Sequence, residues 1–294
     1  MNVTVTGIPV FSGAYVSGTE LAPAALRAAG LTAVLQEQGL SASDRGDLAL
    51  PAYLPRHNVP PVRNWPAPRM VWDLLREEAR GCFRRDEFSL FLGGDCSVIV
   101  GTAQGFRDVY GDKAYLLVLD GHFDAMAPSA SRCLGAAGMG LWFLLQGGGV
   151  WTEATGWTAD SIVVLGCQRM PDETYGVEIV TLDQLCERGP GMQAADVLRA
   201  IPADAYILVH FDVDVMHKEA MAAAYSPSET GLSLAQTEEL LTAVLADPRV
   251  VGANVTEFSA LRDVTGEQAS RLVRLLGRAL AARTTPSGSD TIQI

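Results

Sequence analysis

The sequence predicts an α/β fold in which helices cover both faces of a central, mainly parallel sheet. Segments with strand character alternate with helical segments along the chain, and most strands are continuous apolar runs. Strands buried on both faces have this composition, whereas strands with one wet face alternate between apolar and polar residues. Carboxylates and histidines directly follow several of these runs. Ligand sites in such sheets lie at the carboxyl ends of the strands, so the same pattern also predicts where the site is.

Length and composition are those of a globular protein with a large core. The chain has 294 residues, of which 48% are hydrophobic and 19% are charged, and its net charge is −12. This charge argues against a nucleic-acid partner and favours a cationic substrate. The five cysteines contain no C-x-x-C pair, which favours a reducing compartment, and we expect a cytoplasmic protein. We find no secretory signal and no charge-free apolar stretch of about 18 residues, so no membrane span is expected.

In the first half of the chain, apolar runs predict strands and apolar faces predict helices. A strand at 3–10 precedes a helix at 21–30, which has Pro23 in its first turn and Gly30 at its end. Residues 43–68 are rich in Pro, Asp, Arg and Asn, which predicts a surface excursion. The next predicted elements are a helix at 67–84, a strand at 88–92, a helix at 97–109 and a strand at 116–119.

The second half continues the same alternation. Its predicted elements are a helix at 141–146, strands at 162–166 and 177–181, a helix at 192–201, a strand at 205–215, a helix at 234–246, a strand at 250–255 and a helix at 267–282. We expect a single domain over residues 1–283. Residues 284–294 are rich in Ser, Thr and Gly and predict a mobile C-terminal tail.

The strand at 116–119 runs into the segment Asp120-Gly121-His122-Phe123-Asp124. Residues two apart in extended backbone point to the same side, so two carboxylates and an imidazole converge at the end of this strand. Oxygen and nitrogen donors at this spacing suit a divalent cation such as manganese or zinc. The alternative is a polar turn with a capping aspartate.

A second apolar run, over 205–215, also ends in acids. His210, Asp212 and Asp214 share one face of it. Two uncompensated aspartates at a buried strand end would cost free energy, and a bound metal ion removes that cost. Two such strands therefore favour a metal site over the polar turn.

Six short motifs occur in a fixed order from the first helix to the last strand. They are Ser17–Arg27 (compare G-x-E-x-G-P-x-x-L-R), Gly93–Ser97 (GGDHS), Asp120–Asp124 (DAHxD), Asp212–Asp214 (SFDxD), Ser226–Ser233 (GTP…GGLS) and Glu257, a glutamate after the last strand. In this order they resemble the ureohydrolases, the arginase and agmatinase family. The resemblance implies a three-layer α/β/α fold and two divalent metal ions, usually manganese.

The resemblance also implies a ligand for each ion. Asp120 and Asp212 would bridge both ions, Cys96 and Asp124 would complete the first site, and His122 and Asp214 would complete the second. Two such ions activate a water molecule for attack on the central carbon of a guanidine or amidine. The implied products are urea, or a substituted urea, and an amine. Family members are often oligomers, so we expect a homo-oligomer.

The implied catalytic residues are Asp124, Glu257 and His217. Glu257 would hold the planar cation by two parallel hydrogen bonds, the alternative being a surface charge on a loop. His217 would replace a proton-shuttle histidine, the alternative being an exposed loop histidine. Asp172, Glu173 and Ser226 roughly match substrate-binding positions of the family.

The departures from the family pattern concern both the metal and the substrate. Cys96 stands where the family has histidine, and a softer thiolate ligand makes zinc or iron candidates beside manganese. In Cys96, Ser97 and His210 the chain resembles hydrolases of N-omega-hydroxyarginine, so we expect a substituted guanidine of this kind. Gly135 falls on the shuttle histidine, and Met126 falls where an asparagine usually binds the amino acid.

The sequence leaves two other interpretations open. With a single metal ion, or with Cys96 as a nucleophile at a helix N-terminus, the chain would be a different kind of hydrolase. Without activity, it would be a binding protein with a ureohydrolase fold. Metal content separates these readings, because the first hypothesis needs two ions for each chain.

Overall fold

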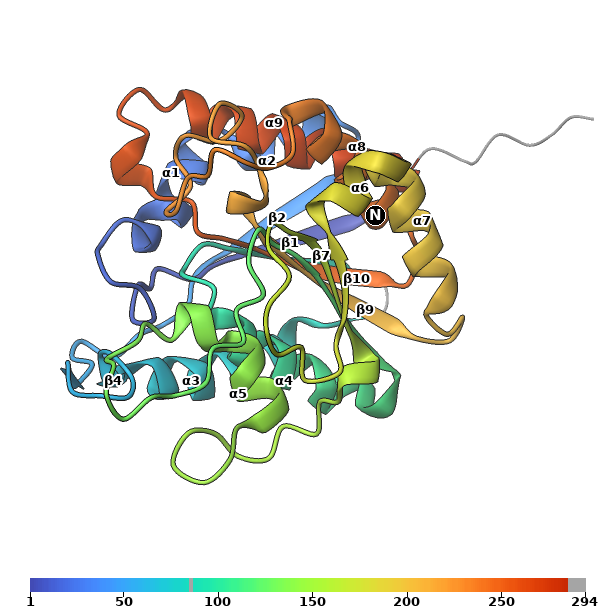
Figure 1. The fold of residues 1–294 in the computed structure, drawn as a ribbon. Helices are drawn as coiled ribbons and strands as arrows, with labels where there is room; N and C mark the ends of the chain where they lie inside the picture. Colours follow the sequence, from blue (N-terminus) through green and yellow to red (C-terminus); the bar gives the residue numbers. More distant parts are fainter. Residues whose placement is uncertain (85–86, 285–294) are drawn as a thin grey trace, which may run out of the picture.

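In the computed structural model, which describes residues 1–84 and 87–284, eight parallel strands form one central sheet (Figure 1). The strand order is β2-β1-β5-β10-β9-β6-β7-β8, and every neighbouring pair runs parallel. The strands are β1 (Asn2–Gly7), β2 (Ser41–Asp47), β5 (Glu87–Leu92), β6 (Ala114–Leu119), β7 (Ile162–Cys167), β8 (Glu178–Thr181), β9 (Tyr206–Asp212) and β10 (Val250–Thr256). The short strands β3 (Arg56–His57) and β4 (Trp65–Pro66) form a separate antiparallel pair.

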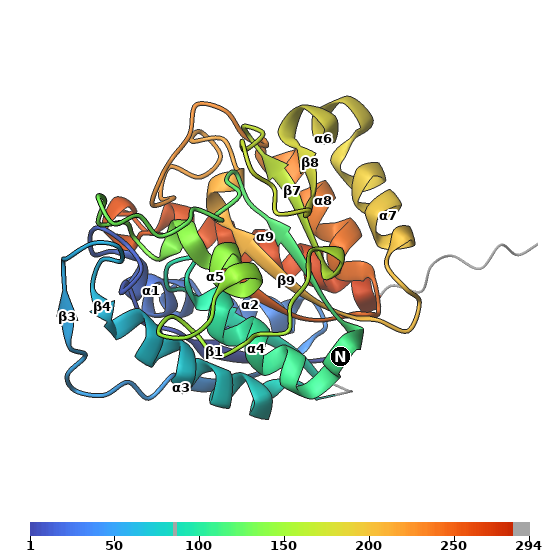
Figure 2. The same ribbon diagram turned by 60° about the horizontal axis from the view of Figure 1, so that its bottom comes forward.

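Helices cover both faces of the sheet, which confirms the predicted three-layer α/β/α architecture. Figure 1 shows one layer above the sheet and one below it, and Figure 2 shows α3, α4 and α5 side by side in the second layer. The first layer contains α1 (Ala22–Ala28), α2 (Leu31–Glu37), α6 (Leu182–Arg188), α7 (Pro190–Ala200), α8 (Leu234–Ala246) and α9 (Glu267–Ala281). The second contains α3 (Ala67–Cys82), α4 (Val98–Tyr110) and α5 (Gly140–Gln146).

The sheet separates two hydrophobic cores. On β9, Ile207, Val209 and Phe211 pack into the core under α7, α8 and α9, whereas Leu208 packs into the core under α3 and α4. Alternate residues of a strand point to opposite faces, so a strand covered on both sides is apolar at every position. His210 lies on the same face as Leu208 and is 1% exposed.

The structure differs from the sequence prediction at the sheet edge and in two helices. Part of the predicted surface excursion is the edge strand β2, which pairs with β1 although its residues are polar and mostly exposed. Backbone pairing alone builds such a strand, and an ion pair of Arg27 with Asp44 at 2.7 Å fastens it. The short helices α2 and α6 were not predicted.

The end of the chain is described only in part. The predicted mobile tail at 284–294 lies outside the described residues except for its first one, Thr284. Among the helices described, none is long and apolar enough to cross a membrane.

Candidate metal centre

Four neighbouring strands deliver the predicted site residues to one edge of the sheet. Strands β5, β10, β9 and β6 are adjacent in this order, and all four are parallel. The chain that leaves them carries Cys96 after β5, Glu257 after β10, Asp212 at the end of β9, and Asp120 after β6. Parallel strands end at the same edge, so residues separated by up to 161 positions in the sequence become neighbours.

Two overlapping groups of ligand atoms lie within this cluster. In the first group, atoms of Cys96, Asp120, Asp124 and Asp212 all lie within 4.8 Å of one another. In the second group, the same holds for Asp120, His122 and Asp214. Asp120 belongs to both, as a bridging carboxylate would. The arrangement thus brings together all six residues of the predicted ligand set.

Hydrogen bonds fix the orientation of these side chains. The backbone N–H of His122 donates to Asp120 Oδ1 at 2.6 Å, and the N–H of Asp214 donates to Asp212 Oδ1 at 2.7 Å. The thiol of Cys96 donates to Asp212 Oδ2 at 2.9 Å, and His122 Nδ1 lies 3.0 Å from Asp214 Oδ2. Asp120 Oδ2 takes no part in these bonds and has no hydrogen-bond partner.

The loop between β5 and α4 approaches Glu257 closely. Gly94 has φ of 80°, a conformation that favours glycine, and its carbonyl accepts from the Glu257 N–H at 3.1 Å. In return, the N–H of Cys96 donates to Glu257 Oε1 at 2.7 Å. These two hydrogen bonds therefore hold the loop that carries Cys96 against the loop that carries Glu257.

Asp124 and Glu257 themselves adopt unusual backbone conformations. Their φ angles are 48° and 61°, in the left-handed region that residues other than glycine seldom occupy. Such conformations cost about 1–3 kcal/mol each and cluster at functional sites. Both positions therefore fit a functional role better than the alternative of an ordinary loop charge.

The cluster is an electrostatically costly group of acids. Burial raises the pKa values of Asp120, Asp212 and Glu257 well above their usual range, and the neighbouring carboxylates raise them further. Burial likewise raises the pKa of Asp124, to about 7, with Asp214 adding to the shift and His122 opposing it. Burial and then Asp212 raise the pKa of the Cys96 thiol well above its usual value. A positive charge at the centre of the cluster would lower all of these raised pKa values.

The two histidines of the cluster differ in their surroundings. The hydrogen bond with Asp214 raises the pKa of His122 to about 9, and its side chain is half exposed. Burial lowers the pKa of His210 to about 3, which keeps its imidazole neutral.

The donor set fits a divalent metal centre. Asp120 Oδ2 and Glu257 Oε2 are buried and have no hydrogen-bond partner. Among the described residues, no lysine or arginine forms an ion pair with the carboxylates of the cluster. Buried acids without compensation are costly, and metal coordination is the usual compensation. Carboxylate oxygens and an imidazole suit manganese or zinc, and the thiolate adds a soft donor.

Two cavities open onto the cluster. The larger, of about 550 Å³, is lined by His122 and Asp124 and by larger side chains that include Phe123, Met126 and Tyr175. The smaller, of about 200 Å³, is lined by Asp212, Asp214 and Glu257 as well as by His122 and Asp124. A small molecule in these cavities can reach both ligand groups.

The substrate-binding predictions fall in different places. Glu173 lines the larger cavity, and Ser226 lines the smaller one. Asp172 is exposed and is absent from both linings. The structure does not bring His217 to this site, because it lines a separate cavity with Glu219 and Arg271.

The predicted position of the shuttle histidine leaves no room for a side chain. A Cβ on Gly135 would lie 2.6 Å from the carbonyl oxygen of Gly13 and 3.2 Å from the ring of Tyr15. The loop 8–18 therefore packs directly onto Gly135. His122 is the histidine that lines both cavities.

Three residues of the site were not recognised from the sequence. Gln168, just after β7, donates from Nε2 to the carbonyl of Asp214 at 3.2 Å and lines the larger cavity. The hydroxyl of Tyr225 accepts from the N–H groups of Tyr15 and Val16 at the rim of the smaller one. Buried Asp95 accepts from the N–H of Gly13 at 2.9 Å. The adjacency of Asp95 and Gln168 to strand ends was the available signal.

Comparison with known proteins agrees with this geometry. The model of the arginase family matches residues 1–282. The chain belongs to the arginase family. Rabbit (Oryctolagus cuniculus) arginase-1 is 27% identical over 292 residues, which cover 92% of this chain and 89% of that protein. Agrobacterium fabrum arginase is 37% identical over 129 residues, 41% of this chain and 38% of that one.

Solved structures of other proteins have the same fold as this arginase-family protein. Arginase from Bacillus caldovelox superposes with a TM-score of 0.82 at 20% identity, covering 95% of this chain and 97% of the other. Proclavaminate amidino hydrolase from Streptomyces clavuligerus gives 0.73 at 22% identity, with 96% and 92% covered. The protein is a hydrolase of amidino C–N bonds, and arginase-family enzymes generally contain two manganese ions.

Proposed function

We propose that this protein is a binuclear metallohydrolase that cleaves a C–N bond of a substituted linear guanidine, such as N-omega-hydroxyarginine. The observation that carries the proposal is the pair of ligand groups that share Asp120. One group has four donors and the other three, which matches the number needed for two adjacent ions. The products would be an amine and a urea or substituted urea.

The residues around the cluster have separate tasks. Cys96, Asp120, Asp124 and Asp212 would hold one ion, and Asp120, His122 and Asp214 the other. When bound, the ions would supply an activated water molecule for attack on the central carbon of the guanidine. Glu257 keeps Oε1 on the Cys96 N–H, and its unpartnered Oε2 is available to a guanidinium N–H.

The lining of the larger cavity departs from the arginase pattern at the amino-acid end of the substrate. Its apolar lining includes Met126 at the position where the resemblance expects an asparagine. Polar groups on its far side are Arg169 and Glu173, and Glu173 Oε1 already accepts from the N–H of Tyr175 at 2.8 Å. The chain therefore lacks this asparagine, and other residues would bind the amino-acid head group of a substrate.

Burial argues against the reading of Cys96 as a nucleophile. A nucleophilic cysteine needs a lowered pKa and access to substrate, whereas Cys96 is 2% exposed and four carboxylates raise the pKa of its thiol. Its side chain donates to Asp212, which suits a ligand of a shared metal ion.

The test is metal content followed by a substrate screen. Purified protein is loaded with manganese, zinc or iron, dialysed, and measured by elemental analysis. We expect two ions for each chain, and release of urea or hydroxyurea from guanidines in a colorimetric assay. Asp120→Asn should lose both ions and all activity, while Asp160→Asn, at an exposed position, should keep both. Full activity of Asp120→Asn, or one ion in the parent, would refute the binuclear site.

A further inference from the structure

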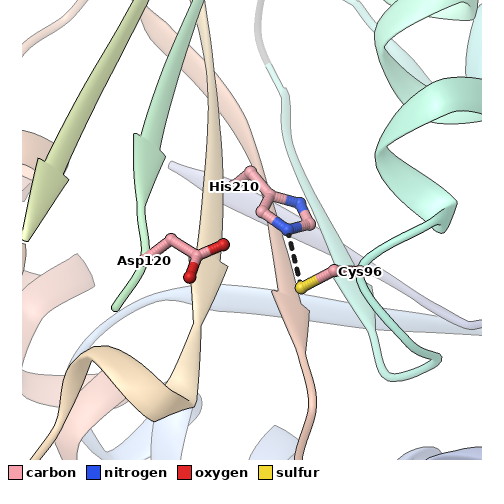
Figure 3. Close-up of side chains that lie close together, drawn as sticks. All are labelled: Cys96, Asp120 and His210. Carbon is pink, nitrogen blue, oxygen red and sulfur yellow. Dashed lines mark hydrogen bonds between the residues drawn. The ribbon is translucent and has the colours of Figure 1, made fainter. Parts of the chain in front are cut away.

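His210 is a buried imidazole that the proposed two-ion site does not use. It comes from β9, two residues before Asp212, and its Nε2 lies 3.3 Å from Cys96 Sγ. Figure 3 shows the ring directed at the sulfur, with the carboxylate of Asp120 beside both on the neighbouring strand. Its Nε2 also lies 3.3 Å from the hydroxyl of Thr256, so the ring contacts both a polar partner and a predicted metal ligand.

The three side chains form a ligand group of their own. Atoms of Cys96, Asp120 and His210 all lie within 4.8 Å of one another, and all three residues are buried. Zinc–sulfur bonds of about 2.3 Å and zinc–nitrogen bonds of about 2.05 Å, at a tetrahedral angle, separate the two donor atoms by about 3.5 Å. The observed 3.3 Å between Sγ and Nε2 is therefore close to the spacing of two ligands on one zinc ion.

The surroundings of His210 can also orient the ring for coordination. The amide of Asn254 lies against the other ring nitrogen, with Nδ2 3.4 Å from Nδ1, and Asn254 Oδ1 is buried without a partner. Asn254 Nδ2 now donates to Thr102 Oγ1 at 2.9 Å. A half-turn of the amide would exchange this bond for an acceptor, Oδ1, at Nδ1–H of His210, and would leave the lone pair of Nε2 on the side of the sulfur. Histidine ligands of metals usually have such an oxygen behind them.

We propose that His210 is a nitrogen ligand of the ion held by Cys96 and Asp120, which makes this half of the centre selective for zinc over manganese. The inference rests on the metal site of the proposed function and adds a ligand to it. A thiolate and an imidazole together prefer zinc or cobalt, whereas the oxygen-rich second group suits manganese. The two halves of the centre would then hold different metals.

X-ray absorption spectroscopy tests the ligand directly, without reference to activity. The variant His122→Gln removes the imidazole of the second group at a half-exposed position, so His210 is the remaining histidine of the cluster that can give an imidazole signal. With one equivalent of zinc, we expect one sulfur neighbour and the multiple scattering of one imidazole. The double variant His122→Gln/His210→Gln should keep the sulfur and lose the imidazole signal. An imidazole-free spectrum in the single variant would overturn the proposal.

Metal affinity provides a second readout. Cobalt is the probe, and its binding at the thiolate site is followed by the sulfur-to-cobalt absorption band. The variant His210→Gln should bind cobalt more than roughly 100-fold more weakly, because roughly 100-fold is the most that an outer-shell partner contributes. His217→Gln, in a separate cavity, is the matched control and should leave the band unchanged. Unchanged cobalt affinity in His210→Gln would refute the ligand role. Because neither readout needs turnover, failure of the ligand proposal is distinguishable from failure to hydrolyse a guanidine.

Discussion

Replacing Asp124 by asparagine should stabilise the metal-free protein while weakening its metal site. Asparagine has nearly the same shape and tolerates the φ of 48° at this position. Folding raises the pKa of Asp124 from 3.8 to about 7. The folded state therefore binds a proton more tightly than the unfolded state, and stability falls as the pH rises from about 4 to about 7. Asparagine does not titrate and escapes this loss.

The size of the effect follows from that shift in the pKa. Linkage gives a gain for Asp124→Asn of about 4 kcal/mol at pH 8 and about 2 kcal/mol at pH 5. Asp124 is only partly buried, so screening by water reduces these figures to about half. We therefore expect about 2 kcal/mol at pH 8 and about 1 kcal/mol at pH 5.

Urea denaturation in the presence of a chelator measures this difference at both pH values. Asp160→Asn, an exposed carboxylate outside the cluster, is the control and should change stability by less than about 0.5 kcal/mol. With metal present, Asp124→Asn should retain one ion where the parent holds two. A metal-free variant that is no more stable than the parent at pH 8, or a gain independent of pH, would refute the reasoning.

Three further predictions concern single residues of the site. Glu257→Gln keeps an oxygen for the Cys96 N–H but loses the charge for a guanidinium, so kcat/KM should fall by about 10- to 100-fold in steady-state assays, and an unchanged value would exclude this contact. Because the pKa of His122 is raised to about 9, metal must displace a proton, and affinity measured by competition should increase from pH 6.5 to 8.5; a flat profile would contradict this. His217→Gln should leave kcat unchanged, since His217 lines a separate cavity, and a large loss would restore its predicted catalytic role.

The fold was predictable where burial dictates composition. Strands β5, β6, β7, β9 and β10 are buried on both faces, so most of their residues are apolar, and this composition predicts a parallel sheet. The edge strand β2 has no such constraint, because one side of it faces solvent and its pairing uses only backbone groups. Its polar sequence was therefore indistinguishable from a loop.

The site was predictable where the sheet itself places the side chains. Side chains that follow a strand within a few residues, such as Asp120 and Asp212, are placed by the sheet itself, and the structure brings them together. Side chains on long loops are placed by tertiary packing. His217 was matched by position alone and lies elsewhere, while Tyr225 reaches the rim through bonds to residues 210 positions away. The contact of His210 with Cys96 also depends on the pairing of β10 with both β9 and β5, which the sequence does not reveal.

The hydrogen bond from the Cys96 N–H to Glu257 has a consequence for binding. It makes the backbone of a metal-ligand candidate and the proposed guanidinium-binding carboxylate parts of one rigid unit, although they are 161 residues apart. An ion that orders Cys96 also orients Glu257, and a guanidinium that orders Glu257 restrains Cys96. Coupling of this kind is reciprocal, so metal and substrate must raise each other's affinity by the same factor. A guanidine added without turnover should therefore slow the loss of metal to a chelator.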